Sequence, residues 1–142
     1  MWHRVWTTTA LTVLAVSALS CAGDEPAPTS SPEAGIATTL SDFKIKPAEA
    51  EVDAGRVTLD LTNDGPSEHT FLLVRTDLAE DALPVTDHVV DVDQLEVVGQ
   101  VDRIEADAER SITAELAAGD YVMFCNLTGH YESDMHAAVA VI

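Results

Sequence analysis

Three side chains that bind soft metal ions stand at equal intervals near the C-terminus: Cys125, His130 and Met135. An apolar run, Tyr121 to Phe124, precedes them, and another, Ala137 to Ile142, follows. This pattern predicts two strands joined by a loop whose soft side chains can converge on one point. A thiolate, imidazole nitrogens and a weak thioether on a rigid β-framework suit copper, which uses such ligands in electron-transfer sites.

The set lacks a second imidazole, and we add His69. It follows the turn-rich segment Asn63 to Ser67 and comes just before the apolar run Phe71 to Val74. A trigonal arrangement of two imidazoles and a thiolate, with a distant thioether, suits both oxidation states of copper. Zinc would instead take a tetrahedral set of Cys, His or carboxylate and would have no use for Met135.

Cys125 is the one thiol expected inside the fold, because the other cysteine, Cys21, lies in an N-terminal tail. Outside the cytoplasm a lone thiol oxidises or forms intermolecular disulfides unless it is protected, and a metal–thiolate bond protects it. Taken singly, Cys125 is also explained as a small buried core residue, His130 as a polar surface group and Met135 as apolar core. Their shared spacing favours the metal site.

The N-terminus has the form of an export signal. One positive side chain, Arg4, precedes the uncharged apolar stretch 5–19, which is too short to span a bilayer. We therefore assign residues 1–20 to a signal peptide. The end of this segment, Ala18-Leu19-Ser20-Cys21, resembles a bacterial lipobox, which implies cleavage before Cys21 and attachment of lipid to its sulfur. The alternative is an ordinary signal peptide with an incidental cysteine.

Residues 21–36 are rich in Pro, Ser, Ala and acidic side chains and show no apolar periodicity, so they predict a flexible linker. The expected protein is then a lipoprotein on the outer face of the cytoplasmic membrane, or else a secreted or periplasmic protein. The folded domain is expected to span residues 37–142.

The chain is strongly acidic, with 25 Asp and Glu against 7 Lys and Arg. Without residues 1–20, which hold Arg4 and no acid, the net charge is −19. Such a surface repels nucleic acid and favours a partner with a basic docking surface, so we exclude nucleic-acid binding. Acidic residues recur from Asp77 to Glu109, where we expect a long surface excursion. A solvated surface is its default explanation, and covering a face or selecting a partner are the alternatives.

Alternating and apolar segments separated by turns predict an all-β domain without a helix, arranged as a β-sandwich. The expected strands are 38–43, 48–52, 57–61, 71–74, 95–101, 111–116, 121–125 and the C-terminal run 137–142.

The stretch Phe124 to Met135 resembles the copper loop of the cupredoxins, with the longer Cys-x4-His-x4-Met spacing of the auracyanin- and sulfocyanin-like members. The segment Asn63 to Phe71 is similar to the one that carries the family's first histidine ligand. The resemblance covers about residues 37–142. It implies a Greek-key sandwich that holds one type 1 copper ion near one end, with His69, Cys125, His130 and Met135 as ligands. It also implies that His130 is the more exposed imidazole and the route for electrons.

Two positions depart from the family pattern. Many relatives have Gly before the axial Met, where this chain has Asp134, which bears on the geometry of the loop. Thr70 stands where a small polar residue usually follows the first His, and its side chain can still bond across to the copper loop. Two further histidines are expected not to bind metal: His88 as a surface residue, and His136 because it points away from the face of Met135.

We do not expect an enzyme, because the chain has neither the extra histidines of a second copper site nor a hydrolytic motif. Three functions remain open. The first is a membrane-tethered one-electron carrier that serves a redox partner protein outside the cytoplasmic membrane. The second is a copper-delivery protein for an extracytoplasmic cuproenzyme, and the third is a metal-free binding module.

Overall fold

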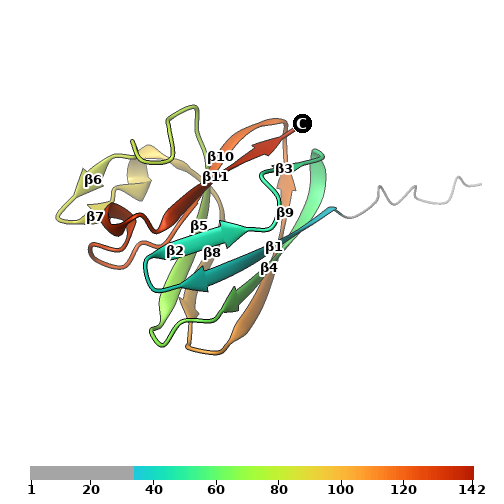
Figure 1. Cartoon of the computed structure of the whole chain (residues 1–142). Coiled ribbons are helices and arrows are strands. Elements are labelled where there is room, and N and C mark those ends of the chain that lie inside the picture. Colours follow the sequence, from blue (N-terminus) through green and yellow to red (C-terminus); the bar gives the residue numbers. More distant parts are fainter. Residues whose placement is uncertain (1–33) are drawn as a thin grey trace, which may run out of the picture.

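The computed structural model describes residues 34–142, which fold into two facing β-sheets (Figure 1). The four-stranded sheet has the order β2-β1-β4-β9, and the five-stranded sheet has the order β3-β11-β10-β5-β8. Sequence neighbours such as β4 and β5, or β8 and β9, lie in opposite sheets, as in a Greek key. The all-β sandwich expected from the sequence is confirmed, and in the described residues the only helices are two 3₁₀ turns, η1 and η2.

The strands of the first sheet are β1 (Ala34–Ser41), β2 (Lys44–Pro47), β4 (Gly55–Asn63) and β9 (Glu109–Leu116). Those of the second sheet are β3 (Glu51–Val52), β5 (His69–Arg75), β8 (Glu96–Ile104), β10 (Gly119–Phe124) and β11 (His136–Val141). A separate hairpin consists of β6 (Val85–Thr86) and β7 (Val89–Val90), and the 3₁₀ turns are η1 (Val92–Gln94) and η2 (Tyr131–Ser133).

Strand β1 begins before the domain start that the sequence indicated. Ala34 to Ile36, which the sequence places in the linker, pair in parallel with β4, and Ile36 is buried opposite Leu59. The apolar side chain of Ile36 is part of the core, which is why the strand extends this far. The signal segment 1–20, the lipidation site Cys21 and the rest of the linker lie outside the described residues. Residues 34–142 contain no helix that could span a bilayer.

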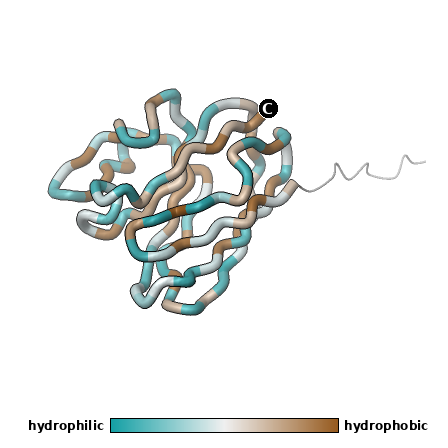
Figure 2. The backbone as a smooth tube through the Cα atoms, in the orientation of Figure 1, coloured by the Kyte–Doolittle hydropathy of each residue, from teal (hydrophilic) through white to brown (hydrophobic). Residues whose placement is uncertain are grey.

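The main core fills the space between the two sheets, and its strands show the alternation expected of half-buried strands. Strand β4 buries Val57, Leu59 and Leu61, while β9 turns Ile112, Ala114 and Leu116 inward as predicted. Figure 2 shows apolar and polar residues alternating along much of the tube. Cys125 and Met135 are also members of this core, so the candidate ligands lie at its end rather than on the surface.

Strand β5 breaks the alternation, because its apolar run is buried on both faces. Phe71 and Leu73 point into the main core, whereas Leu72 and Val74 point outward. These outward side chains belong to a second apolar cluster, in which Leu83 and Val90 of the segment after β5 cover the outer face of the sheet. Its members are Leu72, Val74, Leu83, Val90, Val122, Phe124 and Tyr131.

The strand expected at 95–101, inside the acidic excursion from Asp77 to Glu109, is confirmed as β8, which runs from Glu96 to Ile104 and pairs with β5. The irregular part is confined to residues 76–95, and it forms the cover of the outer face of the five-stranded sheet. Of the roles left open for this segment, covering a face is therefore confirmed.

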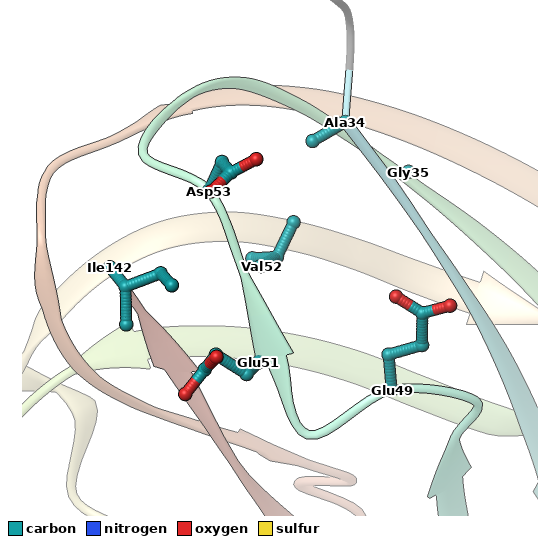
Figure 3. Close-up of a pocket in the computed structure, with 7 residues that line it drawn as sticks. All are labelled: Ala34, Gly35, Glu49, Glu51, Val52, Asp53 and Ile142. Atoms are coloured by element: carbon teal, nitrogen blue, oxygen red, sulfur yellow. The ribbon is translucent and has the colours of Figure 1, made fainter.

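A shallow hollow of about 260 Å³ lies where β1 begins (Figure 3). Glu49, Glu51 and Asp53 line it together with the C-terminal residue Ile142. These carboxylates do not converge on one point: among residues 34–142, the groups within ligating distance of one another lie elsewhere. That cluster is at the opposite end of β1.

Candidate metal centre

Three different elements place the candidate ligands at one end of the sandwich. His69 is the first residue of β5, and Cys125 directly follows β10, which pairs with β5 in antiparallel register. The start of one strand therefore lies beside the end of the other. His130 returns to this point through Gly129, whose φ of 76° is the left-handed conformation that glycine adopts at no steric cost.

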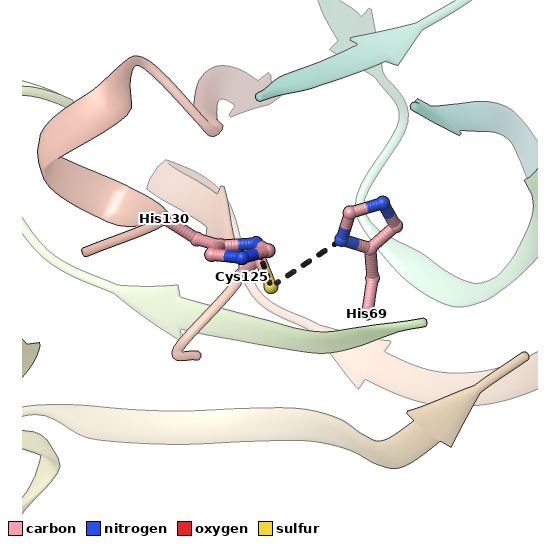
Figure 4. Close-up of side chains that lie close together, drawn as sticks. All are labelled: His69, Cys125 and His130. Atoms are coloured by element: carbon pink, nitrogen blue, oxygen red, sulfur yellow. Dashed lines mark hydrogen bonds between the residues drawn. The ribbon is translucent and has the colours of Figure 1, made fainter. Parts of the chain in front are cut away.

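The sulfur of Cys125 lies between the two imidazoles (Figure 4). Its Sγ is 3.9 Å from Nδ1 of His69 and 3.6 Å from Nδ1 of His130. One ligand atom from each of the three residues lies within 4.8 Å of the other two, and in the described part of the chain they form the one such group of three. The structure thus brings together three of the four residues that the sequence indicated.

These distances fit a single metal ion. Metal–nitrogen and metal–sulfur bonds of about 2.0 to 2.3 Å, placed 120° apart, separate the nitrogen from the sulfur by about 3.8 Å. The two sulfur–nitrogen separations in the structure lie on either side of that value. Two imidazoles and one thiol without a carboxylate are ligands that suit copper.

His69 and His130 differ in their exposure to solvent. His69 and Cys125 are fully buried, whereas His130 is half-buried and its ring packs against the exposed ring of Phe43, with centroids 5.3 Å apart. The expectation that His130 is the more exposed imidazole is confirmed. It is the ligand candidate that a partner can reach from solvent.

Burial lowers the pKa of His69 below its ordinary value of 6.5, because a charged imidazole is poorly solvated there. The nearby His130 lowers this pKa further, while the Asp42 carboxylate, 3.5 Å from Nε2, opposes the shift. The neutral form of His69 is therefore favoured. A neutral imidazole has a free lone pair on one nitrogen, which metal binding requires.

Thr70 joins the strand of His69 to the loop of Cys125. Its backbone N–H points at the Cys125 sulfur at 3.4 Å, and its Oγ1 lies 3.6 Å from the same atom. The same Oγ1 accepts a hydrogen bond from the backbone N–H of Asn126. The bond across to the loop that the sequence suggested is therefore present, and it holds the thiol in place between the two histidines.

Met135 is fully buried in the core beside Cys125, and its carbonyl oxygen accepts a hydrogen bond from the Cys125 N–H at 3.1 Å. Asp134, which precedes it, has a φ of 69°. This backbone is left-handed, a conformation that Asp tolerates better than most residues do. The role of Met135 as a fourth ligand stays a prediction.

The segment 76–95 is attached to the loop between Cys125 and Met135 at several points. The side chain of Asn126 bonds both the N–H and the carbonyl of Val90, and the N–H of Gly129 bonds the carbonyl of His88. The hydroxyl of Tyr131 donates to the Glu80 carbonyl and accepts from the Leu83 N–H. These contacts fix the loop from its outer side.

The other two histidines of residues 34–142, His88 and His136, lie outside the cluster. His88 is exposed and pairs with Glu132 at 2.7 Å, whereas the ring of His136 packs against Tyr131, with centroids 5.0 Å apart. Neither belongs to the group of potential ligands found in residues 34–142. Sequence reasoning missed two residues that touch the imidazoles: Asp42, beside His69, and Phe43, beside His130. They form the turn between β1 and β2, and no pattern in that short segment identifies them as neighbours of the metal site.

Two auracyanins and a rusticyanin are among the solved structures that share this fold. Auracyanin from Roseiflexus castenholzii is 18% identical, with a TM-score of 0.62, and the match covers 78% of this chain and 98% of that one. Auracyanin A from Chloroflexus aurantiacus, described as a "blue" copper protein, is 19% identical, with a TM-score of 0.54 and coverage of 76% and 99%. Rusticyanin from Thiobacillus ferrooxidans is 16% identical, with a TM-score of 0.58 and coverage of 76% of each chain.

No family model matches the chain, and no curated protein matches its sequence. The similarity to the solved structures therefore shows the fold: residues 34–142 form a sandwich of the cupredoxin type. The position of the histidine and cysteine side chains within that fold comes from this chain's own geometry.

Proposed function

We propose that this protein is a type 1 copper protein that carries single electrons. The observation that supports this most is the placement of two imidazole nitrogens 3.9 and 3.6 Å from one thiol sulfur, at the end of a rigid sandwich. A copper ion held there would supply a one-electron couple between Cu(I) and Cu(II). The solved structures of the same fold, one of them described as a "blue" copper protein, agree with this assignment.

Each residue has a separate part in the proposal. Cys125 supplies the thiolate, and His69 supplies a buried imidazole that solvent does not reach. His130 supplies the imidazole at the surface, where a redox partner approaches. Met135 is proposed as the distant fourth ligand because it is buried beside Cys125 and closes the loop.

The rigidity of the loop favours a carrier over a copper-delivery protein. Thr70 and Asn126 fix Cys125 from two sides, and the ligand atoms of His69 and Cys125 are fully buried. A delivery protein must release its ion to an acceptor, which is easier from an exposed or mobile site. A pre-arranged site changes little between oxidation states, and this is what rapid electron transfer needs.

Spectroscopy tests the proposal directly. Cu(II) added to the purified, metal-free protein is expected to give the intense blue absorption band of a thiolate-to-copper transition. The Cys125→Ser variant should bind Cu(II) without that band. Failure of the native protein to develop the band would leave a metal-free binding module as the better explanation. Reversible oxidation and reduction without loss of copper, in the presence of an apo-acceptor, would separate a carrier from a delivery protein.

We further propose that lipid on Cys21 tethers the domain to the outer face of the cytoplasmic membrane. Strand β1 (Figure 1) supports this arrangement, because it begins at Ala34, the first described residue, and ends at Ser41, one residue before Asp42, which contacts His69 of the cluster. Eight residues of strand extend over roughly 25 Å, so the site would face away from the membrane. Mass spectrometry of the membrane-extracted protein should find a diacylglyceryl group on Cys21, and Cys21→Ala should release the protein in soluble form.

A basic partner is the third part of the proposal. The chain from Cys21 onward has a net charge of −19, and residues 76–102 contain no Lys or Arg. Several of the acidic residues that produce this charge lie on the segment 76–95, which is attached to the loop that carries His130. Steering by charge weakens with salt, so the rate of electron transfer to the true partner should fall steeply with ionic strength. A rate independent of salt would contradict a basic docking surface.

A further inference from the structure

The far side of the His69 ring carries an unusual polar contact. Nε2 of His69 is buried and forms no hydrogen bond of ordinary length within residues 34–142. Oδ1 of Asp42 lies 3.5 Å from it, slightly beyond the usual hydrogen-bond range. A buried polar atom without a partner costs free energy. The position of the Asp42 carboxylate, the polar group beside this nitrogen, therefore requires an explanation.

The Asp42 carboxylate is itself held in place. Ser67 Oγ donates a hydrogen bond of 3.2 Å to its second oxygen, Oδ2. Gly65 leaves space for it: a Cβ on Gly65 would lie 3.1 Å from Asp42 Oδ1 and 3.0 Å from the Asp42 backbone nitrogen. The turn between β1 and β2 and the turn before β5 are therefore fitted to each other around this carboxylate.

The chemistry of a carboxylate determines what it does to an imidazole. An ionised carboxylate only accepts hydrogen bonds, so it favours the neutral His69 tautomer that has its proton on Nε2. That tautomer leaves the lone pair on Nδ1, the nitrogen that faces the Cys125 sulfur. Carboxylates behind metal-bound histidines orient the ring and raise the basicity of the ligating nitrogen.

We propose that Asp42 is a positioning residue, which holds His69 in the Nε2–H tautomer and so directs its free Nδ1 toward the copper position beside Cys125. The proposal rests on the proposed function, because it assigns Nδ1 to a metal ion. Binding of a cation at Nδ1 makes the Nε2–H group a stronger donor, so the 3.5 Å contact is expected to shorten in the loaded protein.

The tautomer can be measured without any metal. In the ¹⁵N-labelled, metal-free protein at neutral pH, the chemical shifts of the two ring nitrogens identify which one carries the proton. Native protein should show His69 with the proton on Nε2, and Asp42→Ala should show a mixture of tautomers. An unchanged Nε2–H tautomer in Asp42→Ala, or an Nδ1–H tautomer in the native protein, would overturn the proposal.

A charge-matched control is available at the same end of the sandwich. Asp107 lies in the turn between β8 and β9, which Asn63 ties to the start of β5 through its bonds to the carbonyls of Glu105 and Ser67. Asp107→Asn removes one negative charge without touching His69, so it should leave the tautomer unchanged. Circular dichroism establishes that each variant is folded. Should Asp42→Ala fail to fold, Ser67→Ala, which releases Oδ2, should show a smaller change in the same direction.

Copper binding gives a second readout. Loss of a carboxylate behind a ligating histidine typically weakens metal binding by about 10- to 100-fold, and we expect a loss of this size in Asp42→Ala. The reduction potential of the loaded variant should rise, because the negative charge stabilises Cu(II) more than Cu(I). A native affinity and potential in Asp42→Ala would overturn the role of Asp42. If the native protein binds no copper, the proposed function fails while the tautomer measurement still decides the role of Asp42.

Discussion

The hydroxyl oxygen of Thr70 accepts a hydrogen bond of 2.8 Å from the backbone N–H of Asn126, and so connects the residues that follow His69 and Cys125. The two ligand candidates are far apart in sequence, but each is one position from this bond. Thr70 also directs its own N–H at the Cys125 sulfur. The spacing of thiol and imidazole is therefore set by backbone groups as well as by side-chain packing.

Thr70→Val should destabilise the site without leaving a cavity, because valine has the shape of threonine but cannot accept a hydrogen bond from Asn126. The N–H of Asn126 loses its acceptor, and a loss of about 1–3 kcal/mol in the free energy of unfolding is expected. Chemical denaturation of the metal-free protein measures it. Thr70→Ser keeps the hydroxyl and should retain most of the stability. Equal losses in both variants would mean that the methyl group, not the bond, matters.

Met135→Leu should keep the blue band but raise the reduction potential of the copper-loaded protein. The thioether is a weak donor that favours Cu(II), so a ligand set without it favours Cu(I). Leucine is similar in volume, and the buried site should accept it at small cost. Voltammetry of both proteins is the measurement. If the potential stays the same, Met135 is a core residue and not the axial ligand.

Asp134→Val should destabilise the turn between His130 and Met135. Asp134 has a left-handed backbone, and a β-branched residue is poorly suited to that conformation, at a cost of about 1–2 kcal/mol. Asp134→Gly is the matched control and should be as stable as the native protein or slightly more so. Thermal unfolding of the three metal-free proteins tests this order, and a valine variant as stable as the glycine variant would contradict it.

The sequence was sufficient for the loop because its geometry is local. The positions of Cys125 and His130, with Gly129 between them, indicated the turn that the structure contains. Asp42 could not be found this way, because its contact with His69 depends on how the turn between β1 and β2 of one sheet meets the start of β5 in the other sheet. Local spacing carries no information on such a contact.

The packing of the segment 76–95 on the sheet could not be predicted from the sequence either, for a related physical reason. Its acidic residues dominate the pattern, while the few apolar side chains that anchor it, such as Leu83 and Val90, have no periodicity. The available signal was in β5, where the unbroken apolar run of Phe71 to Val74 required a cover on both faces. A strand that is apolar on both sides predicts a second layer, even where that layer has no recognisable pattern of its own.

Acid should destabilise the metal-free protein through His69. The pKa of this imidazole is lowered in the folded state, chiefly by burial, so below about pH 6.5 the unfolded chain takes up the proton more readily. Stability from this group is complete above pH 6.5 and is lost as the pH falls below that value. Denaturant unfolding at several pH values should show this loss, and His69→Gln should reduce its slope. The same slope in both proteins would assign the effect to the carboxylates.

Tyr131→Phe should loosen the attachment of the segment 76–95 to the metal-site loop while leaving the sandwich intact. The buried hydroxyl of Tyr131 bonds the Glu80 carbonyl at 2.8 Å and the Leu83 N–H at 2.9 Å, and phenylalanine can replace neither bond. Because both backbone groups then lack a partner, a cost of about 1–3 kcal/mol is expected. Hydrogen exchange of the Leu83 amide should accelerate in this variant.

Tyr121→Phe provides the control for that measurement, because Tyr121 also donates its hydroxyl to a backbone carbonyl, that of Ala117, at 2.8 Å. Its bond lies at the start of β10, in the turn after β9, so its loss should not change the exchange of the Leu83 amide. Equal acceleration of Leu83 in both variants would show global destabilisation. Acceleration in Tyr131→Phe alone, with a broadened blue band after copper loading, would show that the segment holds the loop in its binding geometry.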